Sequence, residues 1–115
     1  MKTITKYIDS IRSNIEFNIG QNVQENFKII DDSKENYLWF HIHHLPSCHV
    51  IACINDVYDK KQLHKIAVQG AMLCKQYSKY KSDKGVEVMY TKVQNVSKTD
   101  IMGSVNVSDY KVISV

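Results

Sequence analysis

Apolar residues recur along the chain with two different periods, and the combination predicts an α+β fold. Between residues 59 and 80 they return at helical spacing, and Asp59 stands where a helix N-cap is expected. On a helical wheel one face of this segment is apolar and carries Leu63, Ile66, Ala67, Gly70, Leu73, Cys74, Tyr77 and Tyr80. We therefore predict one long amphipathic helix over residues 59–80.

Shorter runs in which apolar and polar residues alternate predict strands. These runs lie at residues 15–19, 37–44, 48–54, 86–90, 105–107 and 112–115. Pro46 separates the second run from the third, and Gly103 indicates a turn. Together with the helix, these runs predict a mixed or antiparallel sheet of about five to seven strands, packed by one long amphipathic helix.

The first thirty residues predict a short helix and a hairpin. Apolar residues return at helical spacing at Ile4, Tyr7, Ile8 and Ile11, which predicts an N-terminal helix over residues 3–13. The polar segment 21–26 then predicts a turn, with residues 27–30 as a return strand. With one proline and four glycines there is no linker-like stretch, so we expect a single domain over residues 1–115.

Charge is distributed unevenly. The 115 residues are 43% hydrophobic with a net charge of +3, which is ordinary for a globular domain. Residues 1–58 carry five basic and seven acidic side chains, a net −2, whereas residues 59–115 carry ten and five, a net +5. A positive second half favours an anionic partner such as a nucleic acid.

The sequence also predicts a cellular compartment. No apolar run approaches the roughly 20 residues that span a bilayer, and residues 1–4 lack the apolar core of a secretory signal. Three cysteines, an odd number, favour free thiols in a reducing compartment. We expect a soluble, intracellular protein of the cytoplasm, which would be the host cytoplasm for a viral source, and no membrane partner.

Four of the five histidines lie within nine residues, at His41, His43, His44 and His49, with Cys48 beside the last. Because imidazole and thiolate are common zinc ligands, one hypothesis is a metal- or nucleotide-binding histidine cluster. The spacing argues against it, since on a strand His41 and His43 share a face while His44 points away. No Cys-x-x-Cys, His-Glu-x-x-His or glycine-rich phosphate loop is present, so we predict no catalytic residue, metal or cofactor.

The far side of the predicted helix supports a different hypothesis. Lysines gather there at positions 60, 61, 65, 75 and 79, and Val68 and Met72 lie among them. Such a face is either solvated or meets an acidic or apolar partner. A protein-protein interaction domain using the basic face of helix 59–80 therefore remains an alternative.

The run from Trp39 to Ile51 resembles the signature of the NFACT-R domain family. In the family, Trp is followed by Phe or Leu and then by His. Three further residues, an aliphatic residue and Pro-Gly-Ser come next, and the signature ends with His-Val-Val. Further segments resemble the family in the same order, at residues 20–26, 86–91, 96–98 and 102–105. The similarity covers roughly residues 15–115 and leaves residues 1–14 as a divergent N-terminal segment.

This resemblance implies a non-enzymatic RNA-binding module. In larger relatives the domain ends a long protein that engages the ribosome and tRNA during rescue of stalled nascent chains, whereas this chain resembles the stand-alone form. We therefore expect tRNA or ribosomal RNA as the partner, a ribosome or protein partner as well, and a link to translation or ribosome quality control. The residues expected to contact nucleic acid are Gln21, Asn22, Trp39, His41, His43, His44, Ser47, His49, Lys65, Lys75 and Lys98.

The chain departs from the family pattern at several charged positions. Gln21, His43 and Cys53 stand where the family usually has a cation. Neutral histidine releases no counterion from a phosphate, whereas protonated histidine does. The departures predict RNA binding that is weaker or more dependent on pH.

Overall fold

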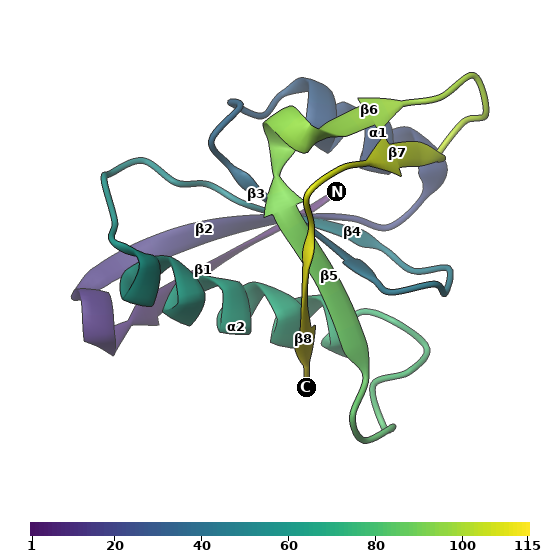
Figure 1. Ribbon diagram of the computed structural model, residues 1–115. Coiled ribbons are helices and arrows are strands. Elements are labelled where there is room, and N and C mark those ends of the chain that lie inside the picture. The colour runs from purple at the N-terminus through teal and green to yellow at the C-terminus, as the bar shows by residue number, and fades with distance from the viewer.

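A computed structural model describes residues 1–115 and shows an α+β domain built around a six-stranded sheet. In spatial order the sheet contains β1 (Lys2–Ile8), β2 (Ser13–Gly20), β4 (His49–Ala52), β3 (Leu38–Ile42), β5 (Glu87–Lys92) and β8 (Lys111–Ser114) (Figure 1). All neighbouring strands are antiparallel. A second sheet pairs β6 (Val96–Lys98) with β7 (Val105–Val107). The predicted α+β class and strand number are confirmed.

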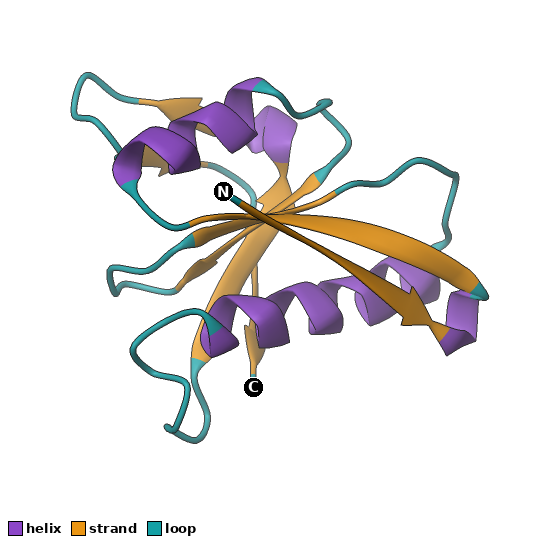
Figure 2. Cartoon of the chain, turned by 180° about the vertical axis from the view of Figure 1, so that it is seen from behind, coloured by secondary structure: helices purple, strands orange, loops and turns teal.

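The two faces of the main sheet are covered differently. Helix α2 (Lys60–Gln76) lies across one face, and α1 (Val23–Asp31) lies on the other side of the sheet (Figure 2). Side chains alternate along β3, so Phe40 is buried in the larger core beneath α2. Trp39 belongs instead to a smaller core that includes Ile29 of α1. The smaller core covers only part of its face, which leaves room for a site.

The predicted helix 59–80 is confirmed over most of its length. Asp59 and Gln62 form a capping box, in which the Asp59 side chain accepts from the Gln62 amide at 2.8 Å and the Gln62 side chain accepts from the Asp59 amide at 2.9 Å. The helix is not clearly amphipathic, because Met72 is exposed while Val68 and Lys75 are half-buried. Neither helix is long and apolar enough to cross a membrane.

The predicted N-terminal helix over residues 3–13 is wrong. Residues 2–8 form the edge strand β1, which pairs with β2, and a short 3-10 turn from Asp9 to Ile11 joins them. Burial along β1 follows a period of two, with Ile8 buried and Lys6 half-buried. The β-branched residues at the start favour a strand, and pairing with β2 overrides the helical spacing.

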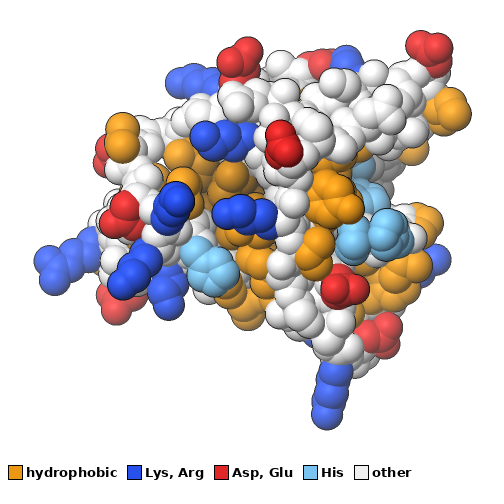
Figure 3. Space-filling view, viewed as in Figure 1, with side chains coloured by type: hydrophobic (Ala, Val, Ile, Leu, Met, Phe, Trp, Pro, Cys, Tyr) orange, Lys and Arg blue, Asp and Glu red, His pale blue; other side chains and the backbone are white.

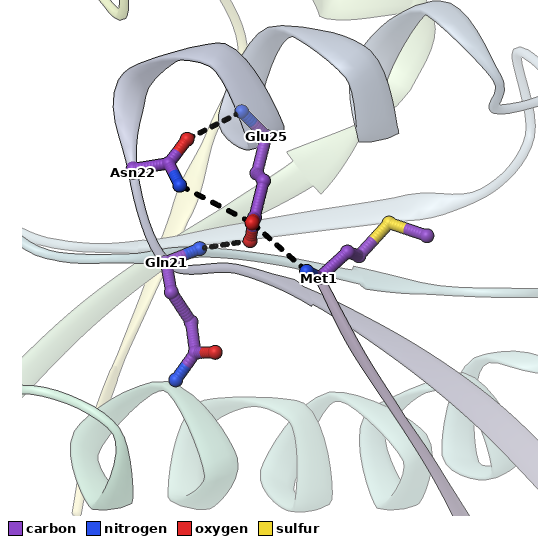
Figure 4. A network of polar contacts seen from close by, with 4 residues as sticks. All are labelled: Met1, Gln21, Asn22 and Glu25. Carbon is purple, nitrogen blue, oxygen red and sulfur yellow. Dashed lines mark hydrogen bonds and ion pairs between the residues drawn. The ribbon is translucent and has the colours of Figure 1, made fainter.

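The predicted hairpin over residues 15–30 is also wrong, because residues 23–31 form α1 rather than a turn and a return strand. Asn22 caps the helix by accepting from the Glu25 amide at 2.9 Å, and the Glu25 carboxylate accepts from the Gln21 amide at 3.1 Å (Figure 4). The Met1 ammonium lies 2.9 Å from the same carboxylate. The ammonium and the Gln21 amide lower the pKa of Glu25. These contacts fix the start of α1 beside β1.

The other predicted strands are confirmed with shifted ends. Gly103 has a φ of +84° in the predicted turn, a conformation that favours glycine. The strand run 37–44 ends early at Ile42, so His43 and His44 lie in a turn where His44 has a φ of +62°. The expectation that His43 and His44 point to opposite faces is therefore wrong, and their ring centroids lie 3.8 Å apart.

Candidate nucleic-acid interface

Trp39, His41 and His49 form a ring cluster on the partly covered face of the sheet. Trp39 and His41 alternate along β3, so they share this face, and their rings stack nearly parallel at 5.8 Å between centroids. His49 begins β4, and its ring stands edge-on to both, 5.3 Å from Trp39 and 5.0 Å from His41. Two adjacent strands therefore bring together three of the predicted site residues.

Hydrogen bonds fix the orientation of both histidines. The Trp39 indole N–H donates to Nδ1 of His49 at 3.1 Å, and the His49 backbone amide donates to the Asn26 side chain at 3.2 Å. His41 Nδ1 lies 2.6 Å from the Ile42 carbonyl oxygen. Burial, with a smaller contribution from His41, lowers the pKa of His49 to about 3. Burial also lowers the pKa of His41, against the opposing effect of its hydrogen bond to Ile42. Both rings are therefore neutral at neutral pH.

A hollow of about 510 Å³ opens above this cluster, and we call it the histidine hollow. Its walls come from β3, the β3–β4 loop, β5 and the segment that leads from β7 to β8. The lining includes Trp39, His41, His44, His49, Met89 and Tyr110, with loop residues 45–46 and 103–104 and strand β7. No Asp, Glu, Lys or Arg side chain contributes to it. The hollow is therefore uncharged and combines apolar walls with imidazole rings.

A second hollow of similar volume opens on the α2 side of the sheet, where Leu38, Leu63 and Tyr90 line it, and we call it the lysine hollow. It is lined by Lys60 and His64 of α2 together with Lys92, Lys111 and Asp109. Three lysines against one aspartate make it positively charged. Asp109 and Lys111 line this hollow while Tyr110 between them lines the first, so one short segment separates the two. Figure 3, a view toward this edge of the sheet, shows several histidines gathered at one side and lysines over the middle and the other side, with one further histidine among the lysines.

Several predicted contact residues lie outside both hollows. Asn22 caps α1, and the neighbouring Gln21 points toward α2 (Figure 4). The Ser47 hydroxyl accepts from the Ile42 amide at 3.1 Å and donates to the Cys48 carbonyl at 2.9 Å, which closes the β3–β4 loop. His43 lies next to the histidine hollow, with Nε2 3.3 Å from the Tyr110 hydroxyl.

The three predicted lysines are scattered. Lys65 lies exposed on α2, away from the lining of both hollows. Lys75 Nζ donates to the Val115 carbonyl oxygen at 3.2 Å. Lys98 Nζ lies 2.6 Å from the Asp31 carboxylate and 5.3 Å from the centre of the Phe27 ring. Lys65, Lys75 and Lys98 therefore form no common surface with the histidines.

The site contains residues that the sequence did not single out. Met89, Tyr110, Lys92 and Lys111 come from β5 and from the segment entering β8, which lie next to β3 only through the order of the sheet. The alternation of residues 86–91 could have indicated Met89, because it pairs with His41 across the two strands. No local pattern indicated Tyr110.

Geometry gives no support to metal or thiol chemistry at the histidines. No three His, Cys, Asp or Glu side chains are grouped so that they could hold a metal ion. Burial, with a smaller effect of Glu16, raises the pKa of the Cys53 thiol to about 11. The pKa of Cys74 is also raised, by its hydrogen bond with Cys48 and by burial. Thiols held in the protonated form, as at Cys53 and Cys74, are poor nucleophiles. The hydrogen bond with Cys74 lowers the pKa of Cys48.

An antiparallel sheet that offers rings in an uncharged hollow beside a lysine-lined one is typical of domains that bind unpaired nucleic acid. The sequence of residues 10–109 matches the family described as the NFACT protein RNA-binding domain. The chain belongs to this family, which confirms the resemblance read from the run at residues 39–51.

Among solved structures, the fold is similar to that of the C-terminal part of the fibronectin/fibrinogen-binding protein from Streptococcus suis. The TM-score is 0.79 with 20% sequence identity, and the similarity covers 96% of this chain. It spans only 44% of that structure. No curated protein matches the sequence. At this identity, the likeness concerns the fold alone.

Proposed function

We propose that this protein binds single-stranded RNA across the β8 edge of the main sheet, where the histidine hollow and the lysine hollow open on opposite sides of the segment from Asp109 to Lys111. The observation that carries the proposal is the difference between the linings of the two hollows. An uncharged hollow lined by rings suits a base, and a neighbouring hollow with three lysines suits the phosphate that follows it. The membership in an RNA-binding family supports RNA as the ligand.

Salt-dependent binding tests this proposal. The double variant Lys92→Glu/Lys111→Glu should lose at least tenfold in affinity for a short single-stranded RNA, because phosphate contacts contribute most of the affinity. It should also show a shallower dependence of affinity on salt than the wild type. Fluorescence anisotropy at two salt concentrations measures both quantities.

Lys84→Glu is the matched control, since Lys84 is exposed in the loop before β5 and lines neither hollow. It makes a charge change of the same kind and should reduce affinity only slightly. Equal losses in the Lys92/Lys111 and Lys84 variants, after allowing for the doubled charge, would mean that RNA binding depends on net charge and not on the two hollows. Losses confined to Lys65→Glu and Lys75→Glu would favour the basic face of α2.

We further propose that the RNA is tRNA or ribosomal RNA, that the protein acts without catalysis, and that it works in the cytoplasm in translation or ribosome quality control. The support is the resemblance of the run at residues 39–51 and the four accompanying segments to NFACT-R domains that engage the ribosome and tRNA. Competition of unlabelled tRNA, ribosomal RNA fragments and duplex DNA against the labelled strand tests the choice of ligand. Stronger competition by duplex DNA than by either RNA would overturn it.

A further inference from the structure

His41 and His49, which line the histidine hollow, have fixed and opposite tautomers. An indole N–H can only donate, so His49 Nδ1, which receives it at 3.1 Å, carries no proton. The neutral ring must then carry its proton on Nε2. A carbonyl oxygen can only accept, so His41 Nδ1, at 2.6 Å from the Ile42 oxygen, carries the proton and leaves a lone pair on Nε2.

Neither Nε2 atom has a hydrogen-bond partner within the protein, where Trp39 and Ile42 contact only the Nδ1 atoms. No fully buried side-chain nitrogen or oxygen in the protein lacks a partner, so each unpartnered Nε2 retains some exposed surface. His41 is half-buried and His49 is 2% exposed. The rings lie 5.0 Å apart between centroids and both line the histidine hollow. The hollow therefore presents one donor, on His49, next to one acceptor, on His41.

We propose that the histidine hollow binds a single unpaired nucleobase. It recognises a base whose edge carries a hydrogen-bond acceptor next to a hydrogen-bond donor. His49 Nε2–H donates to the base, for example to a ring nitrogen, and His41 Nε2 accepts from the base, for example from an exocyclic amino group. Apolar lining from Met89 and Tyr110 suits the faces of the base. This inference rests on the proposed RNA binding and names what that binding recognises.

The uncharged lining argues for a base over a phosphate or a carboxylate. No lysine or arginine reaches the hollow to neutralise an anion, and the lysines lie in the neighbouring hollow. Because burial keeps both rings neutral, the donor and the acceptor keep their places across the neutral pH range. A pair of hydrogen bonds to one edge typically discriminates by about tenfold or more.

Base analogues test the inference on the wild-type protein. Three oligomers of equal length and charge are compared by anisotropy: oligocytidine, a strand with phenyl rings in place of bases, and an abasic strand. We expect oligocytidine to bind at least tenfold more tightly than the phenyl strand, which can stack but cannot form the two hydrogen bonds. His41→Phe, which keeps a ring against Trp39, should remove that difference and leave the salt dependence unchanged. Lys111→Ala is the contrast, because it should weaken all three strands by a similar factor.

The possible failures are distinguishable. If the wild type binds all three strands equally, RNA binding stands and recognition of a base edge is overturned. If it binds none of them at low salt, the proposed function itself is wrong. Should His41→Phe fail to fold, ring ¹⁵N chemical shifts of the wild type give a second test, with protonated Nδ1 expected for His41 and protonated Nε2 for His49. The reverse assignment at either ring would overturn the inference.

Discussion

His49 is the residue on which the site depends most, because it is both buried and hydrogen-bonded at two points. Its relative exposure is 2%, its ring accepts from Trp39, and its backbone amide donates to Asn26 of α1. The pKa of about 3 means that the folded protein keeps the ring neutral in mild acid. In the unfolded chain the same imidazole takes up a proton near pH 6.5.

This difference predicts a loss of stability in acid. Between pH 6.5 and 3 the unfolded state binds a proton at His49 that the folded state does not, so the free energy of unfolding falls as the pH falls. The loss should approach about 2 kcal/mol at pH 5, from about 1.4 kcal/mol per pH unit. Urea unfolding at pH 7.5 and pH 5 measures it.

His49→Gln retains an acceptor for the Trp39 N–H and removes the titrating group, so it should be less sensitive to acid than the wild type. His64→Gln, at an exposed position on α2, is the control and should keep the wild-type sensitivity. If the His49 and His64 variants lose stability equally between the two pH values, the account of His49 is wrong.

At the scale of elements, α1 matters because it packs beside Trp39 and hydrogen-bonds to His49 on the same side of the sheet. Its start depends on Asn22, which caps the helix, and its residue Asn26 accepts from His49. The family resemblance placed Asn22 among the RNA contacts, but its side-chain oxygen is occupied by the Glu25 amide at 2.9 Å. Asn22 therefore has a structural role as the N-cap of α1, and this role does not involve RNA.

Asn22→Ala should therefore destabilise the protein by about 1 kcal/mol, the usual cost of losing an N-cap. The affinity for RNA of the folded variant should stay within about twofold of wild type. Gln24→Ala is the control, because Gln24 is exposed in the first turn of α1, and it should change neither the stability nor the affinity. Thermal or urea unfolding and anisotropy measure the two effects. A large loss of affinity at unchanged stability would restore Asn22 as a contact residue.

The elements that the sequence predicted correctly are those whose pattern is local. Helix 59–80 and the strands around residues 39 and 50 carry their own periodicity, and Asp59 caps as expected. The strand predicted at residues 15–19 is present as β2. The N-terminal helix predicted over residues 3–13 was wrong because β1 becomes a strand through pairing with β2, which the helical spacing does not reveal. A cap signal for α1 was present, since Asn22 precedes Glu25 by three residues, and it was interpreted as a turn.

For the site, the density of histidines indicated the right place. His41 and His49 share a face because their strands pair, as the alternation allowed. What the sequence could not supply was the position of Tyr110 in the lining, because it depends on the order β3-β5-β8 in the sheet. Nor could it show that Trp39, at 1% exposure, supports the two histidines from below and leaves no open face for a base.

At the scale of the whole molecule, part of the positive charge of residues 59–115 gathers on the α2 side of the sheet near its β8 edge. Lys60 from α2, Lys92 from β5 and Lys111 from β8 meet in the lysine hollow although they are far apart in the sequence. The segment from Asp109 to Lys111 divides this hollow from the histidine hollow. A strand of RNA lying across that segment would place a base on one side and a phosphate on the other.

The indole N–H resonance of Trp39 reports most directly on this arrangement. The chain has one tryptophan, and its N–H donates to the ring that would donate to the base. During titration of ¹⁵N-labelled protein with a short single-stranded RNA, this resonance should shift together with the backbone amides of His41, Tyr110 and Lys111. RNA binding that leaves the Trp39 resonance unmoved and shifts the amides of Lys65 and Lys75 on α2 would contradict the account.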